Sequence, residues 1–482
     1  MDKPIYIYNS LERKKIPLKP APAELKMYVC GPTVYDEPHI GHARSAYIFD
    51  VIRRYLIYKG YKVKFVRNVT DVDDKIIDKA RKEYTGEDLN IAFKKVAEKY
   101  LDSYHKALGE LGIAFSEPEI IEPKASEYIG KMIEFIDGLI KRGVAYQSGG
   151  DVYFDITKAK SYGKLSNQSL DKLEVGVRVA AGENKKNPLD FALWKSTKED
   201  EPFWESPWGK GRPGWHIECS AMSSDLLGDE FDIHGGGIDL IFPHHENEIA
   251  QSEGAGKKFA QIWIHHGLLT INGQKMAKSL GNFVTIKDFI NKYKYPDFLK
   301  LFFLSAHYSN PIDYTEEKIE DVIKAFERIF TLYKNINRKL AGQNSYFHAE
   351  NFDEIASIKN KFIEAMDDDF NTAQGLSFVF ELVTIANKRL DDLTFIYNVK
   401  ETLELFLEEV LGFSSLFLLL RADSIYSLTK FKDIKIEDMI KEREHLRREK
   451  RFLDADKIRI ELERQGIILE DTKEGTAWRR KL

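Results

Sequence analysis

The sequence has little cysteine, little net charge and no long apolar run. Only two cysteines occur among the 482 residues, so a disulfide framework is not expected. The net charge of −5 excludes a global basic surface, and any contact with nucleic acid must therefore be local. The apolar stretch over residues 410–420 is too short to span a bilayer and is expected to be a buried helix. Without a signal-peptide pattern at the N-terminus, we predict a cytoplasmic location.

Strand and helix patterns alternate in the first half of the chain. Residues 26–29 and 62–66 read as strands, and residues 41–59 between them carry apolar side chains every four positions, which is typical of a helix. This βαβ opening predicts a parallel sheet with the active site at the carboxyl ends of its strands. The rhythm breaks over about 84–211 and resumes near residue 230. We expect an α/β fold with a Rossmann-like catalytic domain over 1–312 and an insertion over about 84–211.

The second half of the chain reads as helical. We predict an all-α bundle over 313–425 and a small C-terminal domain over 436–482. The segment from Lys441 to Leu482 holds 13 Lys and Arg against 10 Asp and Glu, a local net charge of +3 in an otherwise acidic chain. The aspartates at 367–369 are predicted to form a solvated turn or helix start rather than a metal site.

Two short signatures carry the chemistry. His39-Ile40-Gly41-His42 places two imidazoles at the start of a predicted helix, where amide groups and the helix dipole favour phosphate. Lys275-Met276-Ala277-Lys278-Ser279 places two point charges on a loop, suited to neutralising departing pyrophosphate. Each pattern alone has ordinary explanations, such as a helix cap or a solvated surface. Together they predict phosphate chemistry on ATP.

A glycine run follows the strand predicted near residue 230. His234-Gly235-Gly236-Gly237-Ile238-Asp239 gives a ligand room against the backbone, and Asp239 suits ribose hydroxyls. An ordinary glycine-rich turn is the alternative. We predict ATP contacts at Gly236 and Asp239.

A second cluster has the chemistry of metal ligands. Pro243 favours a helix start, which places His244 and Glu248 on one helical face at i and i+4. With Cys30 and Cys219 they form a donor set acceptable to zinc. The spacing is long-range, so the sequence does not establish that the four converge, and His245 competes with His244.

Five longer motifs stand beside the two signatures. They are Cys30-Gly31-Pro32-Thr33-Val34-Tyr35-Asp36, Arg67-Asn68-Val69-Thr70-Asp71-Val72-Asp73-Asp74-Lys75, Gly214-Trp215-His216-Ile217-Glu218-Cys219-Ser220, Phe242-Pro243-His244-His245-Glu246-Asn247-Glu248 and Gly475-Thr476-Ala477-Trp478-Arg479-Arg480. Together with the signatures, these motifs resemble the cysteinyl-tRNA synthetases, a family of class I aminoacyl-tRNA synthetases. The similarity covers essentially the whole chain.

The resemblance implies a monomeric ligase that activates L-cysteine with ATP and Mg²⁺. Cysteinyl-adenylate would then pass to the 2′-hydroxyl of the terminal ribose of tRNA(Cys), and one zinc ion per chain would select the thiol. Ala277 departs from the family, whose lysine loop more often carries serine, but both lysines remain and we expect activity to survive. The implied residues are Cys30, Cys219, His244 and Glu248 for zinc, Thr70, Trp215 and His234 for the amino acid, and His39, His42, Lys275 and Lys278 for catalysis and ATP.

Partner and function have alternatives. The basic C-terminal region favours tRNA, because Trp478, Arg479 and Arg480 suit base stacking and phosphate contacts, although Trp478 could instead be a packing residue. A relative that joins cysteine to an amino sugar would need the same zinc and ATP residues but not this region. A non-enzymatic zinc protein that binds nucleic acid leaves both phosphate signatures unused. A simple nucleotidyltransferase explains neither the zinc set nor the C-terminal half.

Overall fold

A computed structural model describes residues 3–19, 24–113, 120–168, 185–197, 201–341, 352–417, 434–464, 467–472 and 475–480. The chain divides into two compact units, Met1–Ser414 and Ser415–Leu482. Among the described residues, no helix combines the length and apolar character needed to cross a membrane.

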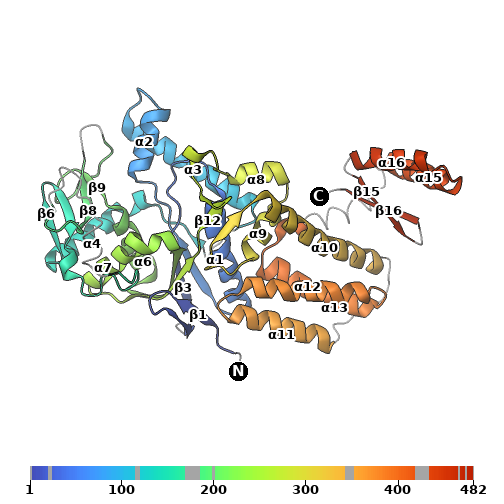
Figure 1. Cartoon of the computed structure of the whole chain (residues 1–482). Helices are drawn as coiled ribbons and strands as arrows, with labels where there is room; N and C mark the ends of the chain where they lie inside the picture. Colours follow the sequence, from blue (N-terminus) through green and yellow to red (C-terminus); the bar gives the residue numbers. More distant parts are fainter. Residues whose placement is uncertain are drawn as a thin grey trace. The chain divides into compact units, whose positions relative to one another are not determined.

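A five-stranded parallel sheet forms the centre of the first unit (Figure 1). Its spatial order is β11-β10-β3-β4-β5, so β3, the first of these five strands along the chain, lies in the middle and the order reverses beside it. A doubly wound sheet of this kind binds ligands at the carboxyl ends of its strands, next to the reversal point. The α/β prediction is confirmed. The strands are β3 (Leu25–Val29), β4 (Val63–Arg67), β5 (Ile120–Ile121), β10 (Glu230–Gly237) and β11 (Phe259–His266).

Helix α1 (Ile40–Tyr58) connects β3 to β4 and starts at the carboxyl edge of the sheet. It begins because His39 caps it, and it ends at Tyr58, followed by the C-cap Lys59 and by Gly60, whose φ of 87° favours glycine. Its apolar side chains are buried, including Phe49 with no exposed surface. The helix predicted over 41–59 is therefore confirmed to within one residue at each end.

The segment expected as an insertion has two parts. The helices α2 (Asp74–Glu83) and α3 (Leu89–Glu110) lead to β5, which still pairs in parallel with β4. After α4 (Ile129–Lys141), a separate antiparallel sheet begins at Ala145. Its four strands run in chain order and are β6 (Ala145–Ser148), β7 (Asp151–Phe154), β8 (Phe191–Ser196) and β9 (Gly211–Pro213).

The chain then returns to the parallel sheet through α6 (Trp215–Leu227), which packs on β3 and β10. Beyond β10 follow η3 (Ile238–Leu240), η4 (Ile241–His245) and α7 (Glu246–Gly254). The strands β12 (Leu269–Ile271), β13 (Gln274–Lys275) and β14 (Ile312–Tyr314) form a small sheet around the lysine signature. The remaining elements near it are η5 (Lys278–Leu280), α8 (Ile286–Tyr293) and α9 (Asp297–Leu304).

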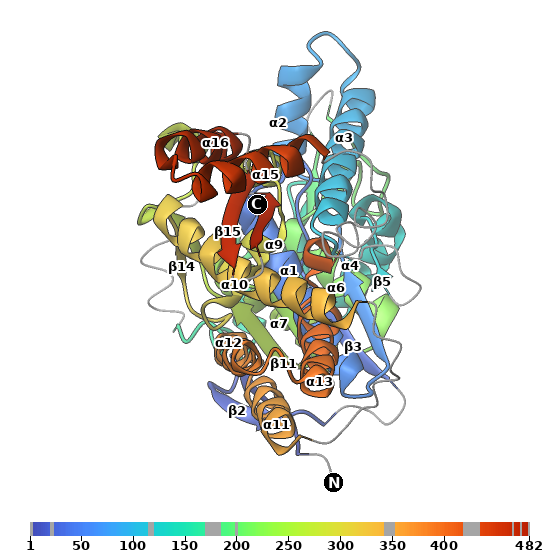
Figure 2. The ribbon, with the colours of Figure 1, turned by 90° about the vertical axis from the view of Figure 1, so that its right-hand side faces the viewer.

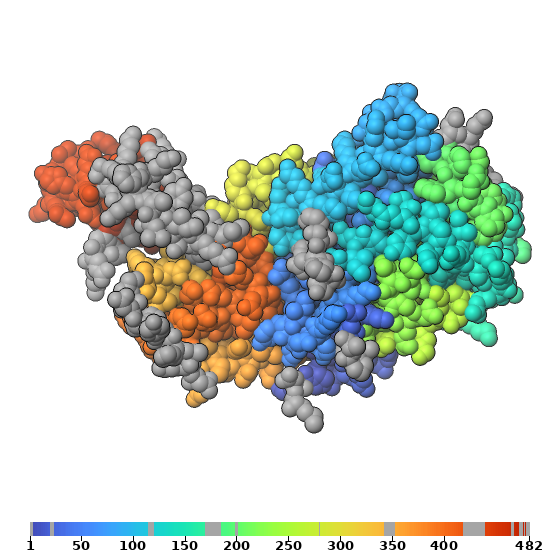
Figure 3. Space-filling view, turned by 180° about the vertical axis from the view of Figure 1, so that it is seen from behind, coloured from blue at the N-terminus to red at the C-terminus, as the bar shows by residue number. Residues whose placement is uncertain are grey.

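A helical bundle completes the first unit, and Figure 2 views several of its helices nearly end-on. The antiparallel sheet and this bundle lie at opposite ends of the unit (Figures 1 and 3). The hairpin of β1 (Tyr6–Asn9) and β2 (Lys14–Pro17) packs beside β11. The bundle comprises α10 (Glu316–Leu340), α11 (Asp353–Asp367), α12 (Thr372–Lys388), α13 (Leu393–Glu404) and η6 (Leu405–Val410).

The aspartates at 367–369 anchor this bundle to the parallel-sheet region. Asp367 accepts hydrogen bonds from the Tyr55 hydroxyl of α1 at 2.6 Å and from Lys59, the residue after that helix, at 3.1 Å. Asp369 accepts the Tyr8 N–H at 2.9 Å. Both are buried, with 7% and 3% of their surface exposed. The prediction of a solvated turn is wrong for these two, because their partners come from segments more than 300 residues away.

The second unit contains α15 (Ile434–Arg448), α16 (Phe452–Arg464) and an antiparallel pair, β15 (Ile467–Thr472) and β16 (Gly475–Arg480). Trp478 is partly buried and packs against a small apolar cluster. That contact matches the packing alternative considered for this residue. The side chains of Arg479 and Arg480 lie outside the described part of the structure, as do the linker residues 418–433.

Candidate functional site

The loops at the carboxyl ends of β3 and β4 bring several predicted residues together. Cys30 follows β3 directly, and its N–H donates to the Gly235 carbonyl of β10 at 3.0 Å. Thr70 lies just beyond β4, and its N–H donates to the Pro32 carbonyl at 3.0 Å. The Gly31 N–H donates to the Asn68 side chain at 2.9 Å. Hydrogen bonds between the loops after β3 and β4 therefore hold these residues in place relative to one another.

The two imidazoles of the histidine signature stack at the start of α1, with ring centroids 3.7 Å apart. His39 Nδ1 accepts the Gly41 and His42 N–H groups at 3.1 and 3.3 Å, and His42 Nδ1 accepts the His39 N–H at 3.2 Å. Burial lowers the pKa of His39 to about 4 and that of His42 well below its ordinary value. Both rings are therefore neutral at pH 7. Since Nδ1 accepts in each ring, the network assigns the proton to Nε2.

The lysine signature lies directly against the histidine signature. The Ile40 N–H donates to the Val284 carbonyl at 3.1 Å, and the Ile286 N–H donates to the Pro38 carbonyl at 3.0 Å. Lys275 lies in β13, and Lys278 starts η5. Lys278 forms an ion pair with Asp36. The fold thus brings together the two signatures that the sequence holds more than 230 residues apart.

The predicted zinc ligands also converge. The sulfur atoms of Cys30 and Cys219 are 3.7 Å apart, and Glu248 Oε1 is 3.6 Å from Cys30 Sγ. His244 Nε2 lies 3.5 Å from Cys219 Sγ and 2.9 Å from the same Oε1. Ligands on a tetrahedral zinc ion with bonds of about 2.0–2.3 Å would be about 3.3–3.8 Å apart. Three of these four separations fall in that range, and all four residues are buried, so the donor set fits zinc.

A second group of potential metal ligands overlaps the first and consists of Cys30, His234, His245 and Glu248. His245 Nε2 is 3.3 Å from Cys30 Sγ, which keeps His245 as a competitor. Its Nδ1, however, hydrogen-bonds His265 at 2.8 Å. His234 lies 2.8 Å from Glu248 Oε2, the oxygen that faces away from His244. These contacts suit residues that orient the first group, as the outer partners of metal ligands do.

The charges in the cluster favour a cation. Burial would raise the pKa of Cys219, but hydrogen bonds from Cys30 and His244 lower it to about 6. Burial would likewise raise the pKa of Glu248, but His234 and His244 lower it to about 2. A thiolate and a carboxylate therefore lie close together at neutral pH. In return, Glu248 raises the pKa of His244 to about 10 against the effect of burial.

The residues expected in the amino-acid pocket surround this cluster. Trp215 is 39% exposed, and its indole stacks on the His244 ring with centroids 4.2 Å apart. The Thr70 hydroxyl donates to Glu218 Oε2 at 2.9 Å, and burial raises the pKa of Glu218 well above its ordinary value. His234 is fully buried and stacks on Trp263. Trp215 thus contacts the cluster directly, and Thr70 is connected to it through Asn68, whose amide group donates to the Thr70 hydroxyl at 3.3 Å and lies 3.7 Å from Cys219 Sγ. His234 contacts Glu248 from a buried position.

The glycine run does not follow β10 as predicted but forms its last residues. A Cβ at Gly235 would come within 2.3 Å of the Phe49 ring on α1, and one at Gly236 within 2.8 Å of the His245 ring. The expectation that this run makes room for a ligand is therefore wrong for Gly235, because the space is filled by Phe49. Asp239 lies beyond the strand in η3 and is exposed.

Sequence reasoning missed several residues of the site. His216 Nδ1 lies 3.0 Å from His244 Nδ1, and Asn68 Oδ1 lies 3.7 Å from Cys219 Sγ. Asp36, the partner of Lys278, was also missed. All three stand inside motifs quoted for the family resemblance, but no spacing rule links them to their partners.

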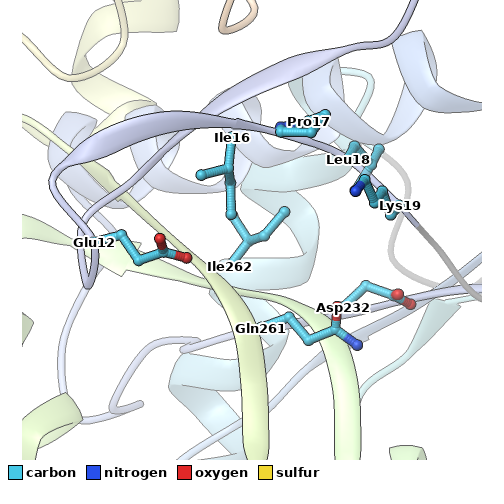
Figure 4. Close-up of a pocket in the computed structure, with 8 residues that line it drawn as sticks. All are labelled: Glu12, Ile16, Pro17, Leu18, Lys19, Asp232, Gln261 and Ile262. Carbon is cyan, nitrogen blue, oxygen red and sulfur yellow. The ribbon is translucent and has the colours of Figure 1, made fainter.

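A separate pocket of about 260 Å³ lies beneath the β1–β2 hairpin (Figure 4). None of its lining residues is a predicted site residue. It lies toward the amino-terminal half of β10, away from the carboxyl edge that carries the site. The lining residues are Glu12, Ile16, Pro17, Leu18, Lys19, Asp232, Gln261 and Ile262.

Comparisons with known proteins agree with the geometry. Residues 18–324 match the family model for the tRNA synthetases class I (C) catalytic domain, and residues 361–415 match the DALR domain. The cysteine–tRNA ligases of Geobacillus thermodenitrificans and Thermococcus gammatolerans are each 47% identical to the chain, with 99% of both sequences covered. A solved methionyl-tRNA synthetase of Mycobacterium tuberculosis, in complex with methionyl-adenylate, is similar in fold, with a TM-score of 0.61 and 14% identity; 82% of this chain and 93% of that chain are covered. The chain belongs to the cysteine–tRNA ligase family of class I tRNA synthetases.

Proposed function

We propose that this chain is a cysteine–tRNA ligase that activates L-cysteine with ATP and transfers the cysteinyl group to the 3′-terminal ribose of tRNA(Cys). The observation that carries the proposal is that the segments with the histidine and lysine signatures lie together at one edge of the sheet, joined by the Ile40–Val284 hydrogen bond and the Lys278–Asp36 ion pair. The same edge holds the cluster of Cys30, Cys219, His244 and Glu248. Similarity over 99% of the chain supports the substrate.

In the activation step, an oxygen of the cysteine carboxylate attacks the α-phosphorus of ATP. A phosphorus–oxygen bond forms, the bond to pyrophosphate breaks, and no general base is needed because the carboxylate is already ionised. His39 and His42 donate Nε2–H hydrogen bonds to the transferring phosphoryl group. Lys275 and Lys278 neutralise the pyrophosphate that leaves, and Gly236 and Asp239 are proposed to contact the rest of the bound nucleotide, a Mg²⁺ complex.

The cluster of Cys30, Cys219, His244 and Glu248 would hold one zinc ion. Bound there, zinc would supply a soft Lewis acid that accepts a thiol group as a ligand far better than the hydroxyl of serine. Zinc content distinguishes the two overlapping ligand groups. We expect Cys219→Ser to lower it well below one ion per chain and His245→Gln to leave it near one.

Three residues would complete the amino-acid pocket. Thr70 is proposed to contact the substrate with the lone pairs of a hydroxyl whose proton is directed to Glu218. Trp215 would cover the substrate beside His244. His234 is buried and would act as a positioning residue through its 2.8 Å contact with Glu248.

In the transfer step, the terminal 2′-hydroxyl of tRNA attacks the carbonyl carbon of cysteinyl-adenylate. An ester bond forms, the bond between the carbonyl carbon and the phosphate oxygen breaks, AMP leaves, and the hydroxyl proton is released. We propose a catalytic domain over 1–312, a helical tRNA-binding bundle over 313–425 and an anticodon-binding domain over 436–482. Trp478, Arg479 and Arg480 are proposed to contact tRNA, with Trp478 offering only its exposed part. A monomeric state and a cytoplasmic location stay predictions from the sequence.

Removal of residues 415–482 tests the role of the second unit. Because the first unit is compact, we expect the truncated chain to retain cysteine-dependent ATP–pyrophosphate exchange within about tenfold. We expect charging of tRNA(Cys) with radiolabelled cysteine to fall by at least about 100-fold, since the phosphate and base contacts are lost. A truncated chain that charges tRNA normally would contradict the role proposed for the second unit. A full-length chain that shows cysteine-dependent exchange but does not charge tRNA(Cys) would instead favour a ligase that joins cysteine to an amino sugar.

A further inference from the structure

The two signature lysines are not equivalent. Lys278 forms an ion pair with Asp36, and its ammonium lies over the Phe283 ring, 4.9 Å from the centroid. Phe283 in turn meets the His39 ring edge-on at 5.3 Å. Among the described residues, Lys275 has no carboxylate partner, and its side chain is exposed. Only Lys278 is therefore held beside the histidine signature.

The surroundings of Asp36 favour the ionised form of its side chain. Its side chain is only 17% exposed, and Oδ1 accepts the Glu37 N–H at 2.9 Å. Lys79 of α2 lies 3.5 Å from the same oxygen. Burial would raise the pKa of Asp36, but the hydrogen bonds from Lys278 and Glu37 keep it below its ordinary value. The carboxylate is thus ionised, and Lys79 remains to balance it when Lys278 moves away.

A fixed carboxylate beside a triphosphate site would repel ATP. Such a carboxylate is useful only in the protein without ATP. The side chain of Lys278 is 54% exposed, so solvent screens its ion pair with Asp36 and the pair is weak. The multiple charges of ATP would displace so weak a partner. The pair can therefore fix the lysine before ATP arrives without trapping it there.

We propose that Asp36 is a positioning residue that holds Lys278 beside His39 in the nucleotide-free protein and yields it to the pyrophosphate portion of ATP. This inference rests on the proposed function, because it assigns Lys278 to that ligand. Asp36 touches no substrate atom and acts through Lys278 alone.

The reactivity of the lysines in the wild-type chain is the first test. Limited acetylation followed by mass spectrometry should modify Lys278 about twofold to fivefold more slowly than Lys275 without ATP. Asp36→Asn keeps the shape but removes the charge, so it should remove that difference, and Asp36→Glu should restore it. Equal acetylation rates of the two lysines in the wild-type chain would overturn the proposal. This comparison uses the wild-type chain alone, so it does not depend on whether a variant folds.

Kinetics supply the second test. Because ATP competes with Asp36 for Lys278, Asp36→Asn should lower the KM for ATP about twofold to fivefold with kcat within twofold. In a Lys278→Met background, Asp36→Asn should change nothing further. An unchanged or raised KM, or an equal effect in both backgrounds, would overturn the proposal.

A matched control and the exchange activity of the wild-type chain distinguish failure of this proposal from failure of the proposed function. Asp391→Asn removes a distant exposed pair with Lys339, 2.7 Å in length, and should change neither acetylation nor KM. If the wild-type chain showed no cysteine-dependent exchange, the proposed function would fail. Acetylation without nucleotide would still report whether Asp36 holds Lys278.

Discussion

At the scale of single residues, each histidine of the first signature does two jobs with its two nitrogens. Nδ1 of His39 caps α1 by accepting backbone N–H groups, and Nδ1 of His42 accepts the His39 N–H in return. The Nε2–H groups remain as donors toward a phosphoryl group. Because both rings are neutral, they stabilise charge as hydrogen-bond donors and not as cations.

The two jobs of His39 can be separated by substitution. Asparagine is a strong N-cap but lacks a group at the position of Nε2. We therefore expect His39→Asn to leave the free energy of unfolding within about 0.5 kcal/mol and to lower kcat for ATP–pyrophosphate exchange about 100-fold. His39→Ala should lose the same activity and about 1 kcal/mol of stability as well. If His39→Asn retained full exchange, His39 would be a helix cap only.

The sequence predicted individual site residues better than their partners. Cys30, Cys219, His244 and Glu248 were identified from their ligand chemistry, and the structure brings them together. Their outer partners follow no rule of spacing, because the contact of His216 with His244 depends on how α6 packs against η4. Such contacts are fixed by tertiary packing, which a single sequence does not display.

At the scale of elements, the end of β10 shows how closely helix and sheet approach. Gly235 is buried, and α1 lies so close that the Phe49 ring occupies the space of a side chain. The histidine signature at the start of α1 thus depends on the absence of a Cβ in a neighbouring strand. Gly31 plays a similar part, since a Cβ there would lie 1.7 Å from the Asn68 carbonyl oxygen.

Substitution of Gly235 tests this packing. We expect Gly235→Ala to lower the free energy of unfolding by about 1–3 kcal/mol, because the added methyl group overpacks against Phe49. Gly138→Ala in α4 is the matched control, since nothing lies within 4 Å of its added Cβ. That change should stabilise the helix by up to about 1 kcal/mol. Urea unfolding measures both, and equal effects at the two positions would contradict the packing argument.

Element types were predictable where the pattern was long and regular. The 19 residues of α1 repeat their apolar positions over several turns, so periodicity defines the helix almost to its ends. The two-residue strand β5 offers no such pattern, and its place in the parallel sheet comes only from pairing with β4. The glycines of β10 read locally as a turn, but pairing with β11 extends the strand through them.

At the scale of the whole molecule, buried neutral histidines link stability to pH. Burial lowers the pKa of His39 to about 4, of His265 to about 3 and of His266 to about 4. The pKa values of His42, His216 and His245 also lie well below the ordinary value. An unfolded chain takes up protons at these histidines below about pH 6.5, whereas the folded chain does not.

Stability should therefore decline as the pH falls from 7.5 to 5. For His39, a folded pKa of about 4 and an unfolded pKa of about 6.5 correspond to a loss of about 2 kcal/mol over this interval. Urea unfolding of the wild-type chain and of His39→Asn at both pH values isolates the contribution of His39 to this loss of stability. The variant should lose about 2 kcal/mol less than the wild-type chain, and identical losses would show that His39 is not buried in its neutral form.

The arrangement of the whole chain was predicted from alternating strand and helix patterns together with the family resemblance. The parallel sheet and the helical bundle follow from those patterns. The way in which the sheet and the bundle are connected does not follow from the patterns, as the aspartates at 367–369 show. Their partners Tyr8 and Tyr55 lie in elements that the local sequence gives no reason to place beside them.

Amino-acid-dependent ATP–pyrophosphate exchange, measured with metal content on the same sample, tests the central claim most directly. We predict exchange with cysteine, at least about 1,000-fold less with serine, and about one zinc ion per chain, because a metal-free pocket would discriminate such near-isosteres only about 100-fold. Comparable exchange with serine would contradict selection of the thiol by zinc. No exchange with cysteine by folded, zinc-loaded protein would contradict the assignment of both signatures to ATP.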